Sequence, residues 1–210
     1  MIALTACYAI EARWIAKRED VQLIRTAVGE SAPEALQRLL GDDTPPLSAL
    51  VSTGFCGALQ ADLRAGNLVL ADVIRHHGEE LLVSPELLER AQRALDAGGH
   101  APRTGACESV AHVADGPGKR VLADGGALAV DMESGPLARW AGEQKVPFLS
   151  LRVVFDSLGM DLPFPAEGSL FGSVLRHPLW SIRAARMGTL AGRALGRAMN
   201  DLVPALEEEA

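Results

Sequence analysis

Short apolar runs alternate along the chain with stretches in which apolar residues recur at helical spacing. The predicted strands cover residues 2–7, 21–28, 47–53, 67–74, 127–132 and 147–156, and the predicted helices cover residues 10–18, 31–41, 85–98 and 134–144. Strands that alternate with helices usually form a parallel sheet whose two faces are covered. The pattern therefore predicts an α/β fold class: a three-layer αβα arrangement around a central mixed, mostly parallel sheet.

Local signals refine the helix boundaries. Ser31 followed by Glu34 predicts a capping box, and Ser84-Pro85 predicts a cap followed by a first-turn proline. Residues 159–178 are rich in Pro, Gly and Phe, which predicts an irregular flap before a long C-terminal helix at about 180–203. No linker or repeat divides the sequence, so we expect a single domain over residues 1–210.

Composition excludes several classes of function. The net charge of −7 and the absence of a basic run with aromatics argue against binding to nucleic acid. Three widely spaced cysteines without a CxxC pair are typical of reduced thiols, so we expect a cytoplasmic protein. Only three residues precede the "LTAC" segment, too few for a signal peptide, and no apolar run approaches the length of a membrane span.

Polar residues follow several predicted strands at their carboxyl ends, where α/β sheets bind ligands. They are Glu11, the glycine loop "TGFCG" at 53–57, the pair Asp131 and Glu133, and Asp156. Asp156 ends the apolar strand "FLSLRVVF", where an acid must be hydrogen-bonded or used. These segments are far apart in sequence, and the topology predicts that they meet at one rim.

Each of these signals also has a structural interpretation. The dipole of the following helix could by itself explain Glu11, and the simpler interpretation of Asp131 is a cap of the helix that starts near Glu133. Cys56 in the glycine loop has no histidine placed as its base, so a small buried side chain is the simpler interpretation. His76-His77 is interpreted as the surface end of a strand rather than a metal site, since no third ligand lies at ligand spacing in the sequence.

Taken together, the motifs resemble the nucleoside phosphorylase and nucleosidase family, which includes the methylthioadenosine/S-adenosylhomocysteine nucleosidases. The resemblance is carried by "ALTACYAIEAR", "IRTAVGESAPEAL", "VSTGFCGALQADLRAGNLVLADVIRHH", "LAVDMES" and "VPFLSLRVVFDS" in this order. Within the family, "GALAVDMES" and the tail "LPFPAEGSLFGSVLRHPLWSIRAARMGTLAGRAL" look most like the hopanoid-associated phosphorylases, which are thought to act on adenosylhopane.

The resemblance implies a role for each rim residue. Glu133 would hold the 2′- and 3′-hydroxyls of ribose, with Met132 against the sugar and Asp131 in a supporting role. Asp156 would act as the acid at purine N7, with a pKa raised by an apolar pocket, and Glu11 would activate water. The loop residues would line the substrate: Phe55, Cys56 and Gly57, supported by Gly54, together with Phe155.

Two positions depart from the family pattern, since Phe55 and Phe155 stand where hydroxyl-bearing or small residues are usual. They make the expected pocket more apolar, which favours water over phosphate beside the Glu11 carboxylate. Arg25, an obvious phosphate ligand in the first half of the chain, lies in the middle of a predicted strand. We therefore expect hydrolysis of a 5′-substituted purine nucleoside, with adenine as the base by resemblance.

Two alternatives stay open at this point. A true phosphorylase would use inorganic phosphate as co-substrate and release a sugar 1-phosphate. A catalytically silent nucleoside-binding protein would have Phe55 and Phe155 filling the reactive volume. No metal and no organic cofactor are expected, and the relatives imply a homodimer.

The predicted C-terminal helix is amphipathic. At about 100° per residue, one sector collects Arg183, Arg186, Arg193 and Arg197, and another collects Met187, Ala191, Leu195, Ala198, Met199 and Leu202. The simpler interpretation is a helix with one face on the core and the other in solvent. The alternative is peripheral contact between the basic stripe and anionic lipid, which would suit a nucleoside that carries a lipid tail.

Overall fold

All six apolar runs that predict strands form strands in the computed structural model, which describes residues 1–18, 21–41, 45–160 and 178–207. They are β1 (Ile2–Ala6), β2 (Val21–Arg25), β3 (Ala49–Ala58), β4 (Leu68–His76), β7 (Ala129–Asp131) and β8 (Phe148–Asp156). Two further strands, β5 (Glu79–Leu82) and β6 (Arg103–Ser109), complete one eight-stranded sheet. Neither reads as an apolar run, and β5 lies largely exposed at the sheet edge.

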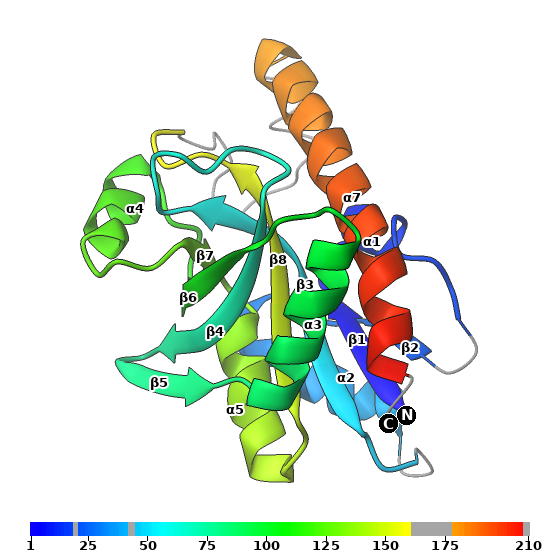
Figure 1. The fold of residues 1–210 in the computed structure, drawn as a ribbon. Coiled ribbons are helices and arrows are strands. Elements are labelled where there is room, and N and C mark those ends of the chain that lie inside the picture. Colours follow the sequence, from blue (N-terminus) through cyan, green and yellow to red (C-terminus); the bar gives the residue numbers. More distant parts are fainter. Residues whose placement is uncertain (19–20, 42–44, 161–177, 208–210) are drawn as a thin grey trace.

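The sheet is mixed and mostly parallel, as predicted. β1 pairs in parallel with β2 and β3, β3 with β8, and β6 with β4 and β7. β7 runs antiparallel to β3, and β4 runs antiparallel to both β5 and β8. The pairings of β3, β8, β4, β6 and β7 therefore form a closed ring, with β1 and β2 continuing the sheet from β3 (Figure 1).

Helices cover both faces of the sheet, which confirms the three-layer prediction (Figure 1). On one face of the sheet, α3 (Pro85–Ala97) and α7 (Pro178–Glu207) pack against the apolar side chains that the strands direct to that side. On the other face, α2 (Ala32–Leu40) and α5 (Ser134–Gln144) bury the alternate positions of the same strands. Two shorter helices, α1 (Ala9–Ala12) and α4 (Gly116–Ala123), and a 3₁₀ turn at Gly29–Ser31 lie at the strand ends.

Of the two helix starts predicted from capping residues, one is confirmed and the other is wrong. Ser84 caps α3, since its hydroxyl accepts a hydrogen bond from the N–H of Leu87 at 3.4 Å. The predicted capping box at Ser31 is wrong. The Ser31 backbone is helical rather than extended, and its hydroxyl donates instead to the carbonyl of Val28 at 3.0 Å.

The C-terminal helix has the predicted amphipathic character. The apolar set from Met187 to Leu202 is buried against the sheet, and the four arginines of the stripe are exposed. Gly192 and Gly196 let the helix approach Trp14, since a Cβ on either residue would overlap Trp14. The predicted flap lies mostly outside the described residues. Within the described part of the chain, no helix has the length and the apolar run that crossing a bilayer requires.

Candidate active site

Glu11 is held rigidly between β1 and β3. It belongs to the first turn of α1, and its carboxylate folds back to accept hydrogen bonds from the N–H groups of Cys7 at 3.0 Å and Tyr8 at 2.8 Å. Its other oxygen accepts from the N–H of Phe55 at 2.7 Å. Burial raises the pKa of Glu11, and the three N–H donors and the charge of Arg152 oppose that rise. A carboxylate removed from water therefore sits at the end of β1.

Gly54 explains why the glycine segment lies beside this carboxylate. Its φ of 144° is in the region that favours glycine, and a Cβ there would lie 2.8 Å from a Glu11 oxygen and 3.1 Å from Nη1 of Arg152. The predicted loop at 53–57 is wrong, because these residues belong to β3, with an irregularity in its pairing at Cys56 and Gly57. The glycine permits close approach of the backbone rather than a turn.

Arg152 is a central residue of the site that the sequence interpretation missed. It lies in the middle of β8, is only 2% exposed, and donates to the hydroxyl of Ser52 at 2.6 Å. Its Nε lies 2.6 Å from Oδ2 of Asp131. Burial alone would lower the pKa of Arg152, but the charges of Asp131 and Glu133 raise it overall. A charged residue inside an apolar strand was the available signal, because a buried arginine must have a partner.

Asp131 combines the two roles that the sequence left open. Its carboxylate accepts from the hydroxyl of Ser134 at 2.7 Å and lies 3.3 and 3.2 Å from the N–H of Ser134, at the first turn of α5. The same carboxylate forms the ion pair with Arg152. Asp131 therefore joins the start of α5 to β8.

Glu133 is also buried, and burial raises its pKa to about 7. The charge of Arg152 opposes the rise, Asp131 and Glu11 add to it, and the N–H of Gly29 opposes it again. Three carboxylates around one guanidinium cannot all ionise easily, so one of them keeps a proton near neutral pH. Glu133 is the group placed to gain or lose that proton.

Asp156 is buried as expected, but its surroundings are not simply apolar. Its carboxylate forms an ion pair with the ammonium of Lys119, from α4, and both side chains are almost fully buried. The expectation that an apolar pocket alone surrounds Asp156 is therefore wrong. Gly57 faces this pair, since a Cβ there would lie 2.9 Å from Cε of Lys119. No sequence pattern indicates this pairing, because Lys119 belongs to a helix that was not predicted.

The two unusual phenylalanines stack against each other. The ring centroids of Phe55 and Phe155 are 5.6 Å apart, and the ring planes differ by 19°. The N–H of Phe55 donates to Glu11, and Phe155 directly precedes Asp156, so the stacked rings come from residues that adjoin both acids. α7 passes close to Phe155, since a Cβ on Gly188 would lie 3.7 Å from its ring.

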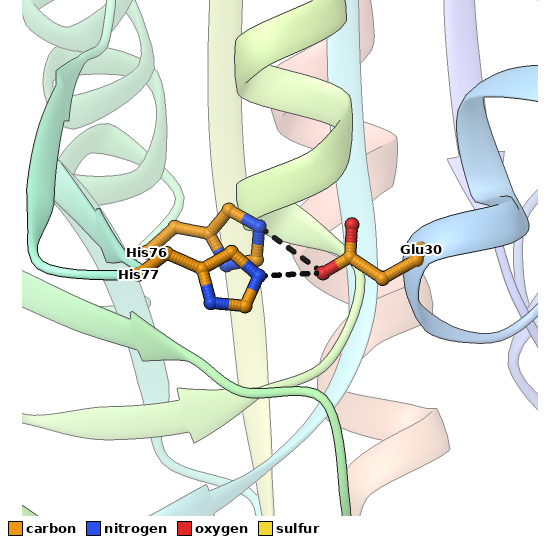
Figure 2. A group of neighbouring side chains, drawn as sticks. All are labelled: Glu30, His76 and His77. Carbon is orange, nitrogen blue, oxygen red and sulfur yellow. Dashed lines mark hydrogen bonds and ion pairs between the residues drawn. The ribbon is translucent and has the colours of Figure 1, made fainter.

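Three other predictions change with the structure. The Cys56 side chain lies in the core under α5, and burial raises its pKa to about 12, so neither a thiolate nor a side-chain substrate contact is supported. Arg25 ends β2 and is exposed rather than lying in mid-strand. His76 is buried rather than on the surface, and Glu30 lies beside both His76 and His77 (Figure 2).

Comparisons with known proteins agree with this fold. The family model described as the phosphorylase superfamily matches residues 12–176. A 5′-methylthioadenosine/S-adenosylhomocysteine nucleosidase from Helicobacter pylori, solved with a pyrrolidine compound, is 15% identical at a TM-score of 0.74, covering 97% of each chain. The futalosine hydrolase of the same organism is 14% identical at a TM-score of 0.74, again over 97% of each chain. An S-adenosylhomocysteine nucleosidase from Streptococcus pyogenes is 17% identical at a TM-score of 0.68, over 95% of this chain and 96% of that one.

Proposed function

The chain belongs to the phosphorylase superfamily, and on this premise we propose that it hydrolyses the N-glycosidic bond of a 5′-substituted purine nucleoside. The observation that carries the proposal is the buried cluster in which Glu11, Glu133 and Arg152 meet at the strand ends. Glycosidic hydrolysis needs a group that binds the sugar, a base for water and an acid for the departing purine. The cluster and the neighbouring Asp156 offer one residue for each task.

Glu133 is the proposed ligand of the ribose. An ionised carboxylate has enough lone pairs to accept hydrogen bonds from both the 2′- and the 3′-hydroxyl. With a pKa of about 7 in the free protein, Glu133 ionises as the pH passes neutrality, so a diol should bind better above pH 7 than below it. A 2′-deoxynucleoside would leave part of the buried carboxylate without a partner and should be a poor substrate.

Glu11 is the proposed base for water. Its carboxylate has about four lone-pair positions, and three are taken by the N–H groups of Cys7, Tyr8 and Phe55. One acceptor position therefore remains for a water molecule. The pKa of Glu11 is raised by burial, which makes it a better proton acceptor than an exposed glutamate.

Asp156 is the proposed acid, and Lys119 is its partner. As the C1′–N9 bond breaks, the electron pair goes to the purine, and N7 takes a proton that Asp156 receives from the Lys119 ammonium. Water adds to C1′ and gives its proton to Glu11, so the products are the free base and the sugar. Exchange with solvent then returns the proton from Glu11 to Lys119, which restores the Asp156–Lys119 ion pair.

Water is favoured over phosphate by the charges around Arg152. Glu11, Asp131 and Glu133 all surround this one guanidinium, which is already paired with Asp131. A phosphate dianion placed there would meet at least two ionised carboxylates in a poorly solvated site, where like charges repel by several kcal/mol at roughly 4 Å separation.

For the 5′ substituent we propose a lipid-like group, with adenosylhopane as the specific candidate. α7 passes over Phe155, beside the site, and its first turns extend past the strand ends in Figure 1. Its outer face exposes the arginine stripe together with Ile182 (62% exposed) and Leu190 (56% exposed). Basic side chains flanked by exposed apolar ones are typical of helices that lie on anionic membranes. This surface would bring the enzyme to a lipid-linked nucleoside.

Sedimentation with vesicles tests the membrane contact. The full chain should sediment with anionic vesicles at low salt and remain in solution at high salt, because screening weakens contacts between arginine and lipid. Replacement of Arg183, Arg186, Arg193 and Arg197 by Gln should abolish binding. Failure of the unaltered protein to sediment at low salt would remove this support for a lipid-linked substrate.

The reaction is tested by adenine release from a panel of 5′-substituted adenosines, with and without phosphate. Hydrolysis predicts phosphate-independent release of free sugar, whereas a phosphorylase would need phosphate and give a sugar 1-phosphate. Glu11→Gln should abolish hydrolysis, and Asp156→Asn should slow it by about 10² to 10⁴-fold. No release from any member of the panel would favour the silent nucleoside-binding protein.

The remaining expectations concern the oligomeric state and the number of domains. We keep the homodimer and the single domain over residues 1–210 as proposals. Light scattering of the full chain tests the first, because the mass of a dimer is twice the 22.2 kDa of the chain. A single cooperative unfolding transition, seen identically by fluorescence and circular dichroism, tests the second.

A further inference from the structure

Glu30, His76 and His77 form a cluster at the end of β4, outside the catalytic groups (Figure 2). The potential ligand atoms of the three side chains all lie within 4.8 Å of one another. Nε2 of His76 is 3.3 Å from Oε1 of Glu30, and Nε2 of His77 is 3.1 Å from the same oxygen. Both imidazoles therefore present the same ring nitrogen to one carboxylate.

The orientation of His76 is fixed by its surroundings. Its side chain is 2% exposed, and Nδ1 lies 3.0 Å from the carbonyl oxygen of Ser109. A carbonyl can only accept, so Nδ1 carries the hydrogen, and in a neutral ring Nε2 then has a lone pair directed at Glu30. Two acceptors face each other here. Either a proton or a metal ion must lie between them.

The backbone at His77 brings the second ring to the same side. Successive residues of a strand point to opposite faces, but His77 has a φ of 51°, in the left-handed region that non-glycine residues rarely adopt. The two rings consequently lie side by side, with centroids 4.0 Å apart. His76 in turn lies directly over Gly135 of α5, where any side chain would overlap the imidazole. This backbone conformation belongs to the two-residue turn His77–Gly78, which joins β4 to the antiparallel strand β5.

We propose that Glu30, His76 and His77 bind a divalent transition-metal ion of the zinc class. Zinc bonds of about 2.0 to 2.2 Å in a tetrahedral site place neighbouring ligand atoms roughly 3.3 Å apart, which agrees with the two separations from Glu30. Two imidazoles and one carboxylate suit zinc better than magnesium or calcium, which prefer oxygen ligands. The carbonyl that fixes Nδ1 of His76 is the usual outer partner of a metal-bound histidine.

The ion would enter from solvent and keep one position for water. Glu30 and His77 are 57% and 59% exposed, whereas His76 is buried behind them. Glu30 belongs to the 3₁₀ turn Gly29–Ser31, and His76 ends β4, so the metal would join this turn to the sheet. The N–H of Gly29 in the same turn faces Glu133. The metal would therefore stabilise a backbone segment that adjoins the ribose-binding carboxylate.

Zinc binding to the full chain, purified without a histidine tag, tests the site. We expect one Zn²⁺ per chain by equilibrium dialysis with elemental analysis, and visible absorption typical of tetrahedral Co²⁺ when cobalt replaces zinc. Glu30→Gln and His77→Ala should each weaken binding at least about tenfold. Both residues are exposed, so these variants should fold normally, which thermal unfolding without metal verifies.

Two exposed residues outside the cluster provide matched controls. Glu34→Gln makes the same charge change at an exposed residue on α2, and His112→Ala removes an exposed imidazole elsewhere. Neither should change zinc affinity by more than about twofold. Absence of stoichiometric zinc binding, or equal affinity in site and control variants, would show that the three side chains share only a proton and would overturn the proposal.

Amide exchange gives a second measurement that does not depend on enzymatic activity. Zn²⁺ should slow exchange at residues 29–31 in the unaltered protein and leave it unchanged in His77→Ala, because the turn is held only when all three ligands are present. Bound zinc without added protection at these amides would overturn the proposed link between the ion and the turn.

Discussion

Replacement of Glu133 by glutamine should change how the stability of the protein depends on pH. Burial raises the pKa of this carboxyl from 4.5 to about 7 in the folded protein. Between these two pH values the folded state binds more protons than the unfolded state, so the free energy of unfolding falls as the pH rises. At 1.36 kcal/mol for each pKa unit, the free energy of unfolding of the wild type falls by about 3 kcal/mol over this interval. The variant does not lose this stability, because glutamine never ionises. The free energy of unfolding of the wild type minus that of the variant should therefore decrease as the pH rises and become constant above about pH 8.

Urea denaturation of both proteins at pH 5 and at pH 8 measures this difference. The stability of the wild type relative to Glu133→Gln should fall by about 2 to 3 kcal/mol between these pH values, with unchanged m-values. Glu34→Gln is the matched control, because Glu34 is exposed and its replacement should give the same difference at both pH values within about 0.5 kcal/mol. A pH-independent difference for Glu133→Gln would refute the reasoning, since it would mean that this carboxyl does not titrate near neutrality.

The remaining predictions concern packing and pairing inside the protein. Lys119→Met should destabilise by about 3 to 5 kcal/mol in urea denaturation by leaving buried Asp156 without its counter-charge, and the double variant with Asp156→Asn should recover most of that loss. Equal stability of single and double variants would contradict the pairing. Gly192→Ala should destabilise by about 1 to 3 kcal/mol, because its Cβ would overlap Trp14. Gly142→Ala, a helical glycine with open space around it, should instead stabilise by up to about 1 kcal/mol, and thermal unfolding that ranks the two alanine variants equally would count against this packing.

The sequence predicts elements well where a single local pattern decides the structure. Apolar runs located six of the eight strands, and a serine before a proline located the start of α3. β5 and β6 were missed because neither contains a long apolar run: β5 has only four residues, two of them glutamates, and β6 consists of polar and small residues that pair with β4. The helix predicted at 10–18 ends at Ala12, and Trp14 turns toward the two glycines of α7. That contact depends on residues near the other end of the chain.

The candidate site was predicted residue by residue but not as a set of pairs. The acids Glu11, Asp131, Glu133 and Asp156 stood out because carboxylates after apolar strands need an explanation. Their cations did not stand out, since nothing local links Arg152 to Asp131 or Lys119 to Asp156. The same limitation misplaced the glycines of "TGFCG". Glycines usually indicate a turn, but here they leave room in β3 for a carboxylate and a lysine that arrive from distant elements.

The closed ring of strands has a consequence for the order in which the protein can acquire its site. Phe55 holds Glu11 across 44 residues of chain, and Arg152 reaches Ser52 across 100. Contacts so distant in sequence form late and slow the folding of a domain, because each closes a long loop. A chain leaving the ribosome would carry β1, β3 and Glu11 long before β8 emerges to complete the ring. Until then the three carboxylates have neither their guanidinium nor their dry surroundings, so the capacity to bind a nucleoside should appear only with the last strand.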